Sequence, residues 1–266
     1  MDDKSPEDVQ LYLSELATRL KKCLGQELIG LYLFGSASYN AYEPGTSDLD
    51  VQAVVEKPLS PLRKHEIAHN ISAHELPCPA RKLEFVVYSA DAIKPATRNP
   101  QFELNFNTGP YNPDYVCLDP SQESSHWFLL DIAIGRETGR ALHGPPPNEA
   151  FAPVPRQWVL EAIIDCLQWH TLNEPNSSNC ILNACRAWRY VVTSTFGSKL
   201  DGAEWAMTQD NSLSIVSDAI IARGTGEKLC RSQTRALVDV VLKAAHDSLV
   251  PMSLSEYGPG TGVPES

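Results

Sequence analysis

The chain has 266 residues, of which 42% are hydrophobic and 21% charged, so a folded globular protein with one large or two small domains is expected. Its net charge of −11 lacks the basic excess of most nucleic-acid-binding proteins, and no nucleic-acid partner is expected. No apolar run approaches the roughly 20 residues of a membrane span, and the polar N-terminus is unlike a signal peptide, so we expect a cytoplasmic protein without membrane contact.

Helices and strands alternate in the first 120 residues. Apolar residues at helical spacing predict a helix over 6–23, and Pro58 and Pro61 favour a second helix over about 61–75. Apolar runs rich in β-branched and aromatic residues predict strands over Glu27–Phe34, Leu49–Val55 and Lys82–Tyr88, with a candidate fourth strand over Phe102–Phe106.

The composition changes near residue 122, after which the apolar spacing predicts helices. They are expected over 126–144, 155–173, 179–197, 213–222 and 228–249. The fold class predicted is therefore α+β: a mixed β-sheet with flanking helices in residues 1–120, then an α-helical bundle in residues 121–255. Residues 256–266 are rich in Gly and Pro and are expected to form a flexible tail.

Three carboxylates are predicted on one face of the sheet. Side chains two residues apart in a strand point the same way, so Asp48 and Asp50 should project together. Adjacent carboxylates repel each other unless a cation lies between them, and Mg²⁺ accepts such oxygen ligands together with substrate phosphates. Gly35 and Ser36 follow the preceding strand and offer backbone N–H groups and a hydroxyl, while Glu84 brings a third carboxylate. Alone, Gly35-Ser36 is an ordinary turn; the ordered set predicts metal-assisted phosphate chemistry.

This order resembles the nucleotidyltransferase superfamily that includes DNA polymerase β. The segments FELNF, DIAI, ALHGPP, RAW and EWAM, with Lys199 thirteen residues after the Arg of RAW, resemble the aminoglycoside 3''/9-adenylyltransferases. The resemblance covers about residues 28–245. It implies an N-terminal nucleotidyltransferase domain, a helical domain that contributes nucleotide and acceptor contacts, and ATP bound with a small acceptor between the two.

The resemblance also implies roles for individual residues. Asp48 and Asp50 resemble the ligands of Mg²⁺, for which two ions are expected, and Glu84 resembles the base that deprotonates the acceptor hydroxyl. The residues that resemble nucleotide contacts are Gly35, Ser36, Ser47, Arg186 and Lys199. For Arg186 and Lys199, an ordinary surface position remains an alternative.

The acceptor-binding positions differ from those of the streptomycin-modifying members. Gly109 stands where those members carry a Trp, and Asn176 and Asn179 stand near their charged acceptor contacts. The aromatic stacking surface and a charge for a guanidinium are therefore missing, which makes spectinomycin a better candidate than streptomycin. The acidic residues open as contacts for a cationic acceptor are Glu103, Asp114 and Asp131, of which Asp131 is equally compatible with a structural role.

The leading hypothesis is a monomeric, antibiotic-modifying enzyme that transfers AMP from ATP, with Mg²⁺, to a hydroxyl of an aminoglycoside or aminocyclitol. One alternative keeps the chemistry and changes the acceptor to an unrelated metabolite or a protein. A further alternative is a catalytically silent nucleotide-binding or antitoxin-type module, against which the presence of Glu84 argues.

Overall fold

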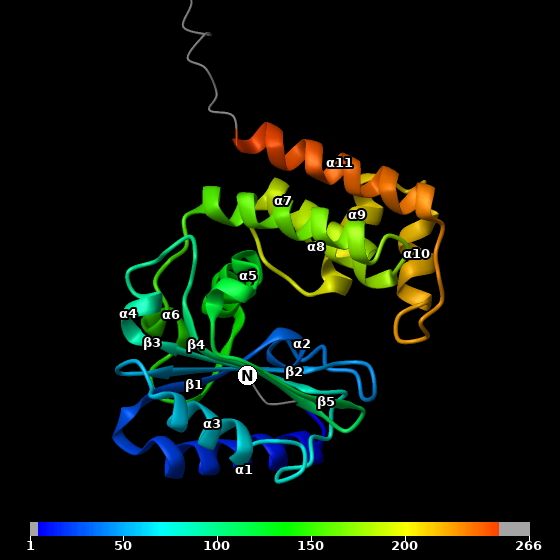
Figure 1. Cartoon of the computed structure of the whole chain (residues 1–266). Helices are drawn as coiled ribbons and strands as arrows, with labels where there is room; N and C mark the ends of the chain where they lie inside the picture. The colour runs from blue at the N-terminus through cyan, green and yellow to red at the C-terminus, as the bar shows by residue number, and fades with distance from the viewer. Residues whose placement is uncertain (1–4, 250–266) are drawn as a thin grey trace, which may run out of the picture.

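The computed structural model describes residues 5–249, and within them the first half of the chain is built on a six-stranded mixed sheet (Figure 1). The strand order is β5-β4-β3-β2-β1-β6, and only the β2 and β3 neighbours run parallel. The strands are β1 Leu28–Phe34, β2 Leu49–Val55, β3 Leu83–Ser89, β4 Phe102–Gly109, β5 Asn112–Cys117 and β6 Arg140–His143.

The two faces of the sheet are covered by different helices. Helices α1 (Glu7–Leu24) and α3 (Pro61–Asn70) pack beneath it in Figure 1, over alternate residues such as Leu49 and Val51. The other face meets α5 (Ser125–Thr138) and carries Val54 and Tyr88. The short connecting elements are η1 Gly25–Glu27, α2 Gly35–Ser38, α4 Ala90–Ile93, η2 Pro120–Gln122 and α6 Pro147–Ala150.

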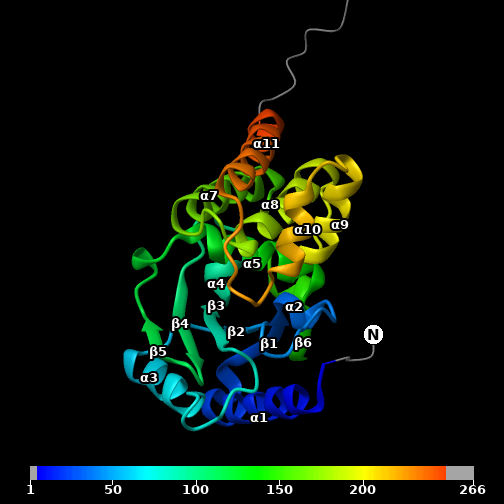
Figure 2. The same cartoon turned by 90° about the vertical axis from the view of Figure 1, so that its right-hand side faces the viewer.

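The second half of the chain is a bundle of helices above the sheet, which we call the helical lobe (Figure 2). Its helices are α7 Arg156–Asn173, α8 Ser178–Thr193, α9 Lys199–Gln209, α10 Ser214–Ile221 and α11 Arg231–Leu249. The predicted α+β fold class is confirmed. Of the helices in the described residues, none has both the length and the apolar character needed to cross a membrane.

Helix α5 belongs to both cores. Phe128 and Ile132 pack with Tyr88 on the sheet, whereas Leu129 and Ala133 belong to the apolar cluster of the helical lobe. Because two neighbouring faces of one helix are buried in two cores, the sheet and the helical lobe are held as one packed unit.

Several predicted bounds are corrected by the structure. The helix expected over 126–144 ends at Thr138, because residues 140–143 pair with β1 and form β6. The sheet therefore draws on residues beyond the predicted boundary at 120, and we propose a boundary near residue 150 instead. Strand β5 and helix α9 were not predicted, and α3 ends at Asn70 rather than near 75. The tail predicted for 256–266 lies outside the described residues.

Candidate active site

Asp50 and Glu84 are direct partners on the parallel strands β2 and β3. Both share the face that carries Val54 and Tyr88, so both point toward α5 and the helical lobe. Desolvation and then the negative charge of Glu84 raise the pKa of Asp50 well above its ordinary value. Desolvation alone would raise the pKa of Glu84, but the charge of Lys82 beside it prevails and lowers that pKa. The pair therefore favours one ionised and one protonated carboxyl group until a cation joins it.

Asp48 lies one residue before β2 and is bound by an arginine. Its Oδ1 accepts a hydrogen bond from Arg81 Nε at 2.8 Å, and its Oδ2 accepts one from Arg81 Nη2 at 2.7 Å. Lys82 Nζ is 3.9 Å from Asp48 Oδ2 and also forms a close ion pair with Glu84. Among the described residues, no three His, Cys, Asp or Glu side chains are gathered as a ready metal site. Asp48 would have to break its hydrogen bonds with Arg81 before Asp48 and Asp50 could bind the same metal ion.

The loop between β1 and β2 passes beside these carboxylates. Gly35 has φ +62°, and a Cβ added there would collide with the Asp50 carboxylate, so this position requires glycine. Ser36 follows in the short helix α2 and is partly buried. Ser47 is buried, and its Oγ accepts a hydrogen bond from the backbone N–H of Glu43 at 3.0 Å. In this structure the Ser47 hydroxyl therefore stabilises the loop to which Ser47 itself belongs.

A network of side-chain amides holds the two cations of the helical lobe. Asn183 Oδ1 accepts from Arg186 Nη2 at 2.9 Å, and Asn179 Oδ1 accepts from Lys199 Nζ at 2.6 Å. Asn183 Nδ2 lies 3.1 Å from both Asn179 Oδ1 and His170 Nε2. Burial lowers the pKa of His170 to about 4, so its neutral ring accepts the amide hydrogen at Nε2. The amides thus fix where Arg186 and Lys199 lie relative to each other.

Lys199 is the first residue of α9 rather than part of a loop. Ser198 and Asp201 form a reciprocal capping box that starts the helix at this point. Desolvation, followed by the nearby charges of Arg186 and Arg223, lowers the pKa of Lys199 to about 8, against the attraction of Asp50 and Glu84. A cluster of cations that repel one another favours a ligand with several negative charges.

Asp131 on α5 connects the electrostatics of the two halves. Its side chain reaches solvent, yet the surrounding protein desolvates the carboxylate and, together with the charge of Glu84, raises the pKa of Asp131 to about 7. Arg186 acts in the opposite direction. Of the acidic residues named as acceptor contacts, Asp131 is the one that interacts with the charges of this site.

The other two acidic candidates are engaged elsewhere. Glu103 is buried. Its Oε2 accepts a hydrogen bond from the backbone N–H of Leu59 at 3.1 Å and forms an ion pair with Lys64 Nζ at 2.8 Å. Asp114 accepts a hydrogen bond from Thr108 Oγ1 at 2.6 Å. Both contacts are structural, and the expectation that these carboxylates are available to an acceptor finds no support in them.

The three acceptor positions inferred from the resemblance differ in their surroundings. Gly109 is buried at the end of β4, and a Cβ there would lie 2.7 Å from the carbonyl oxygen of Arg81, so a larger residue requires a shifted backbone. The Asn179 side-chain oxygen accepts a hydrogen bond from Lys199, and its Nδ2 donates one to Glu174 Oε2 at 3.0 Å. Asn176 is partly buried, and its carbonyl accepts from the backbone N–H of Leu229.

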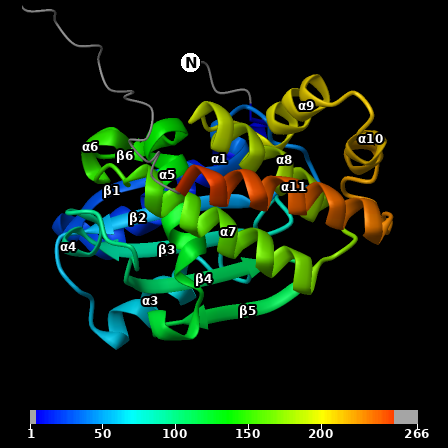
Figure 3. The ribbon, with the colours of Figure 1, turned by 90° about the horizontal axis from the view of Figure 1, so that it is seen from above.

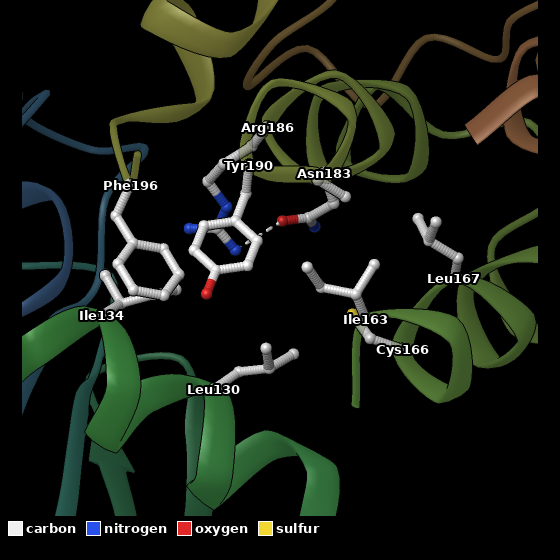
Figure 4. A pocket seen from close by; sticks show the side chains of 10 residues that line it. Leu130, Ile134, Ile163, Cys166, Leu167, Asn183, Arg186, Tyr190 and Phe196 are labelled. Carbon is white, nitrogen blue, oxygen red and sulfur yellow. Dashed lines mark hydrogen bonds between the residues drawn. The ribbon is translucent and has the colours of Figure 1, made fainter. Parts of the chain in front are cut away.

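A small cavity of about 30 Å³ lies behind Arg186, between α5, α7 and α8. Figure 4 shows the Arg186–Asn183 hydrogen bond on one side of this cavity and apolar side chains around the rest. Leu130 and Ile163 are among those apolar residues. The volume suits about one water molecule rather than a substrate. The cavity therefore belongs to the support of Arg186 and not to the acceptor site.

The helical lobe also contacts the loop between β1 and β2. Arg223 Nη1 donates to Glu43 Oε1 at 2.6 Å, and Gly224 packs close to the Thr46 side chain. This contact joins the loop that starts at Gly35 to the segment between α10 and α11.

Comparison with known proteins shows what this chain is similar to. Residues 149–242 match the family described as the aminoglycoside adenylyltransferase C-terminal domain. An aminoglycoside (3'') (9) adenylyltransferase of Shigella flexneri is 27% identical over 215 residues, which cover 75% of this chain and 79% of that protein. Residues 149–242 thus match the C-terminal domain of the aminoglycoside adenylyltransferases, and three quarters of the chain is similar to a protein of that name. This similarity supports an enzyme of the nucleotidyltransferase class.

Two further proteins that are similar to this chain are named for spectinomycin. A spectinomycin 9-adenylyltransferase of Staphylococcus aureus is 26% identical over 196 residues, which cover 71% of this chain and 74% of that protein. A crystal structure of a spectinomycin adenyltransferase from Enterococcus faecialis with ATP and spectinomycin has a TM-score of 0.64 and 19% sequence identity. It covers 91% of this chain and 99% of that chain, and at this identity it shows a shared fold.

Proposed function

We propose that this protein transfers AMP from ATP to a hydroxyl group of an aminoglycoside or aminocyclitol, with Mg²⁺. The observation that carries the proposal is the pairing of Asp50 with Glu84 on one face of the sheet, opposite Arg186 and Lys199 of the helical lobe. Carboxylates for a metal and a base thus face cations for phosphates, as nucleotidyl transfer requires.

The donor atoms fit Mg²⁺. Asp48 and Asp50 would hold it, because both offer hard carboxylate oxygens and the repulsion from Glu84, which helps to raise the pKa of Asp50, favours a positive charge at this point. When bound, Mg²⁺ would neutralise the triphosphate and favour in-line attack. Arg81 would release Asp48 at that point. The exposed guanidinium is free to turn toward other anions, since its side chain is 54% accessible.

Glu84 is proposed as the general base. Lys82 lowers the pKa of Glu84, so the carboxylate is ionised at neutral pH and can accept the proton of an acceptor hydroxyl. The hydroxyl oxygen then bonds to the α-phosphorus of ATP, and the bond from that phosphorus to the β-phosphate bridge breaks. Arg186 and Lys199 are proposed to stabilise the pyrophosphate that leaves.

Spectinomycin is the acceptor that we favour over streptomycin. Gly109 offers no ring for stacking, and the crowding around its Cα by the Arg81 backbone opposes a bulky residue there. Asn179 is bound to Lys199 and carries no charge for a guanidinium. The curated and structural relatives named for spectinomycin support the same choice.

The proposal is tested by calorimetry with ATP and Mg²⁺, followed by mass spectrometry of a panel that includes spectinomycin, streptomycin and other aminoglycosides. We expect Mg²⁺-dependent ATP binding, a mass gain of one AMP on spectinomycin and none on streptomycin. ATP binding without transfer to any panel member would favour a different acceptor or a silent module. Transfer to streptomycin would show that the acceptor assignment is wrong.

A further inference from the structure

Four side chains on one face of the sheet form a row across neighbouring strands. Asp50 of β2 pairs with Glu84 of β3, Glu84 pairs with Asn107 of β4, and Asn107 pairs with Tyr115 of β5. Side chains at paired positions lie on the same face of a sheet. The row therefore leads from the proposed metal ligand and base to an aromatic ring at the sheet edge.

The two ends of the row differ in what lies beside them. On the Asp50 side are β1 and the Gly35 turn, which we assign to the nucleotide. In-line displacement places the attacking hydroxyl opposite the leaving pyrophosphate. An acceptor whose hydroxyl reaches Glu84 must then extend away from β1, toward β4 and β5.

Tyr115 is held in place yet remains accessible. Its hydroxyl donates to Glu123 Oε1 at 2.6 Å, and the same oxygen lies 3.4 Å from Asn105 Nδ2. The residue is 45% exposed, although β5 lies beside β4 along its length. Seen from above, β5 is the outermost strand and the helical lobe leaves most of it uncovered (Figure 3). A ring fixed at its tip and open on its face is suited to stack against a ligand.

We propose that Asn107 and Tyr115 form the acceptor subsite of this enzyme and select a hydroxylated, cationic ring system. This inference rests on the proposed function. The Asn107 amide would hydrogen-bond to ring hydroxyls, and the Tyr115 face would contact a ring bearing an ammonium group, next to the Glu123 carboxylate. Neighbouring strands are about 4.8 Å apart, so the row from Glu84 to Tyr115 spans roughly 10 Å. That length matches two or three fused six-membered rings.

The same row explains how the site can act without a ring at Gly109. Gly109 is buried against Arg81, whereas Tyr115 is the fourth residue of β5, on the facing strand, and is accessible. The aromatic surface is thereby placed farther from Glu84. An acceptor that needs a ring immediately beside the base would be disfavoured, and one that extends to β5 would be favoured.

The test compares the variants Tyr115→Ala, Tyr115→Phe and Asn107→Ala with Tyr111→Ala in the full chain. Tyr111 is 81% exposed at the same hairpin and lies outside the row, so it is a matched control. Steady-state rates are measured with spectinomycin and the other panel members that the wild type modifies, and ATP·Mg²⁺ affinity is measured by calorimetry. Far-ultraviolet circular dichroism verifies that each variant is folded.

We expect Tyr115→Ala to raise the KM for the acceptor about three- to thirtyfold while ATP·Mg²⁺ affinity stays within twofold of wild type. Tyr115→Phe should retain most of the acceptor affinity, because the ring remains. Asn107→Ala should raise the acceptor KM as well, and Tyr111→Ala should leave it unchanged.

If Tyr115→Ala and Asn107→Ala match Tyr111→Ala in an enzyme that modifies the acceptor, the subsite is refuted and the proposed function stands. If the wild type modifies no member of the panel, the proposed function is refuted and the subsite falls with it. If Tyr115→Ala or Asn107→Ala loses ATP binding or its fold, the conservative variants Tyr115→Phe and Asn107→Asp are measured instead. Tyr115→Phe keeps the ring, so a loss of acceptor affinity in this variant, together with an unchanged acceptor KM in Asn107→Asp, overturns the stacking role.

Discussion

Arg81 binds both oxygens of Asp48, with Nε to Oδ1 at 2.8 Å and Nη2 to Oδ2 at 2.7 Å. The guanidinium thus engages both oxygens of the carboxylate that we propose as a ligand of Mg²⁺. Removing one partner of an accessible ion pair typically changes an equilibrium by less than about 1 kcal/mol, although two-point geometry gives the upper part of that range.

Arg81→Ala should therefore bind Mn²⁺ or Mg²⁺ more tightly than wild type in the absence of ATP, by about two- to fivefold. The measurement is Mn²⁺ titration followed by electron paramagnetic resonance. Arg19→Ala is the control, because Arg19 forms an accessible ion pair with Glu15 far from the carboxylates. Equal metal affinity in wild type and Arg81→Ala would mean that Arg81 does not compete with a metal.

Asp50→Asn should abolish Mg²⁺-dependent ATP binding while the protein stays folded. The reason is that Asp50 lies beside Glu84 and is repelled by it, so a neutral amide relieves that repulsion in the absence of metal. Calorimetry measures ATP binding with and without Mg²⁺, and urea unfolding measures stability. Normal Mg²⁺-dependent turnover in this variant would remove Asp50 from the metal site.

Glu84→Gln separates a base from a metal ligand. We expect ATP·Mg²⁺ affinity near that of wild type and a decrease in turnover of about 10²–10⁴-fold, the usual contribution of a general base. Stopped-flow binding and steady-state turnover on one acceptor provide the two numbers. A large loss of nucleotide affinity would instead indicate that Glu84 binds the metal.

Asn183→Ala should weaken ATP binding without touching ATP. Asn183 accepts from Arg186 and donates toward His170, so its loss frees the guanidinium and leaves buried polar groups unpaired. We expect a three- to tenfold higher Kd for ATP·Mg²⁺ and about 1–3 kcal/mol lower stability. Asn173→Ala is the matched control, since Asn173 is exposed and hydrogen-bonds only within α7 as far as the described contacts show. Unchanged ATP affinity in a folded Asn183→Ala protein would argue against positioning.

Stability should fall in mild acid because of His170. Burial lowers the pKa of His170 to about 4 in the folded protein, below the ordinary value of 6.5 in the unfolded chain. Between these values the unfolded state binds a proton that the folded state does not, so the unfolding free energy decreases as pH falls from 6.5 to 4. The loss attributable to His170 is on the order of 2–3 kcal/mol.

Urea unfolding of wild type, His170→Gln and His65→Gln between pH 7.5 and 4.5 tests this assignment. His170→Gln should show a shallower decline than wild type, and His65, which is exposed on α3, should make no difference. A parallel decline in wild type and His170→Gln would place the acid sensitivity elsewhere.

Alternation along the strands was the most informative feature of the sequence. In Leu49–Val55 and Leu83–Ser89 it predicts which face each residue takes, and the structure places Asp50 and Glu84 on one face as register partners. Register between distant strands was not predictable, because it depends on how the strands dock. The row through Asn107 and Tyr115 was therefore invisible, and β5 was missed since Pro113 and Asp114 disfavour a strand.

The residues that hold the site charges were also missed. Arg81 and Lys82 precede β3 in the sequence, but their partners could not be predicted from it. Long cationic side chains can reach carboxylates on other strands, and which carboxylates are near depends on the fold. In the sequence, Asn183 is one of several polar residues on an amphipathic helix. Its role becomes apparent only in the structure, where α7 packs so that His170 lies beside it. One signal was available for Lys199: Ser198 followed three residues later by Asp201 marks a helix start.

Strand β6 has a consequence for how the protein is made. It supplies the outer neighbour of β1, but its residues leave the ribosome only after α5 has been synthesised. A nascent chain that stops near residue 120 would present the β1 edge without a partner, and unpaired edges associate with other chains. A fragment of residues 1–120 should therefore aggregate, whereas a fragment extended to residue 155, with α5 and β6 included, should keep this edge protected.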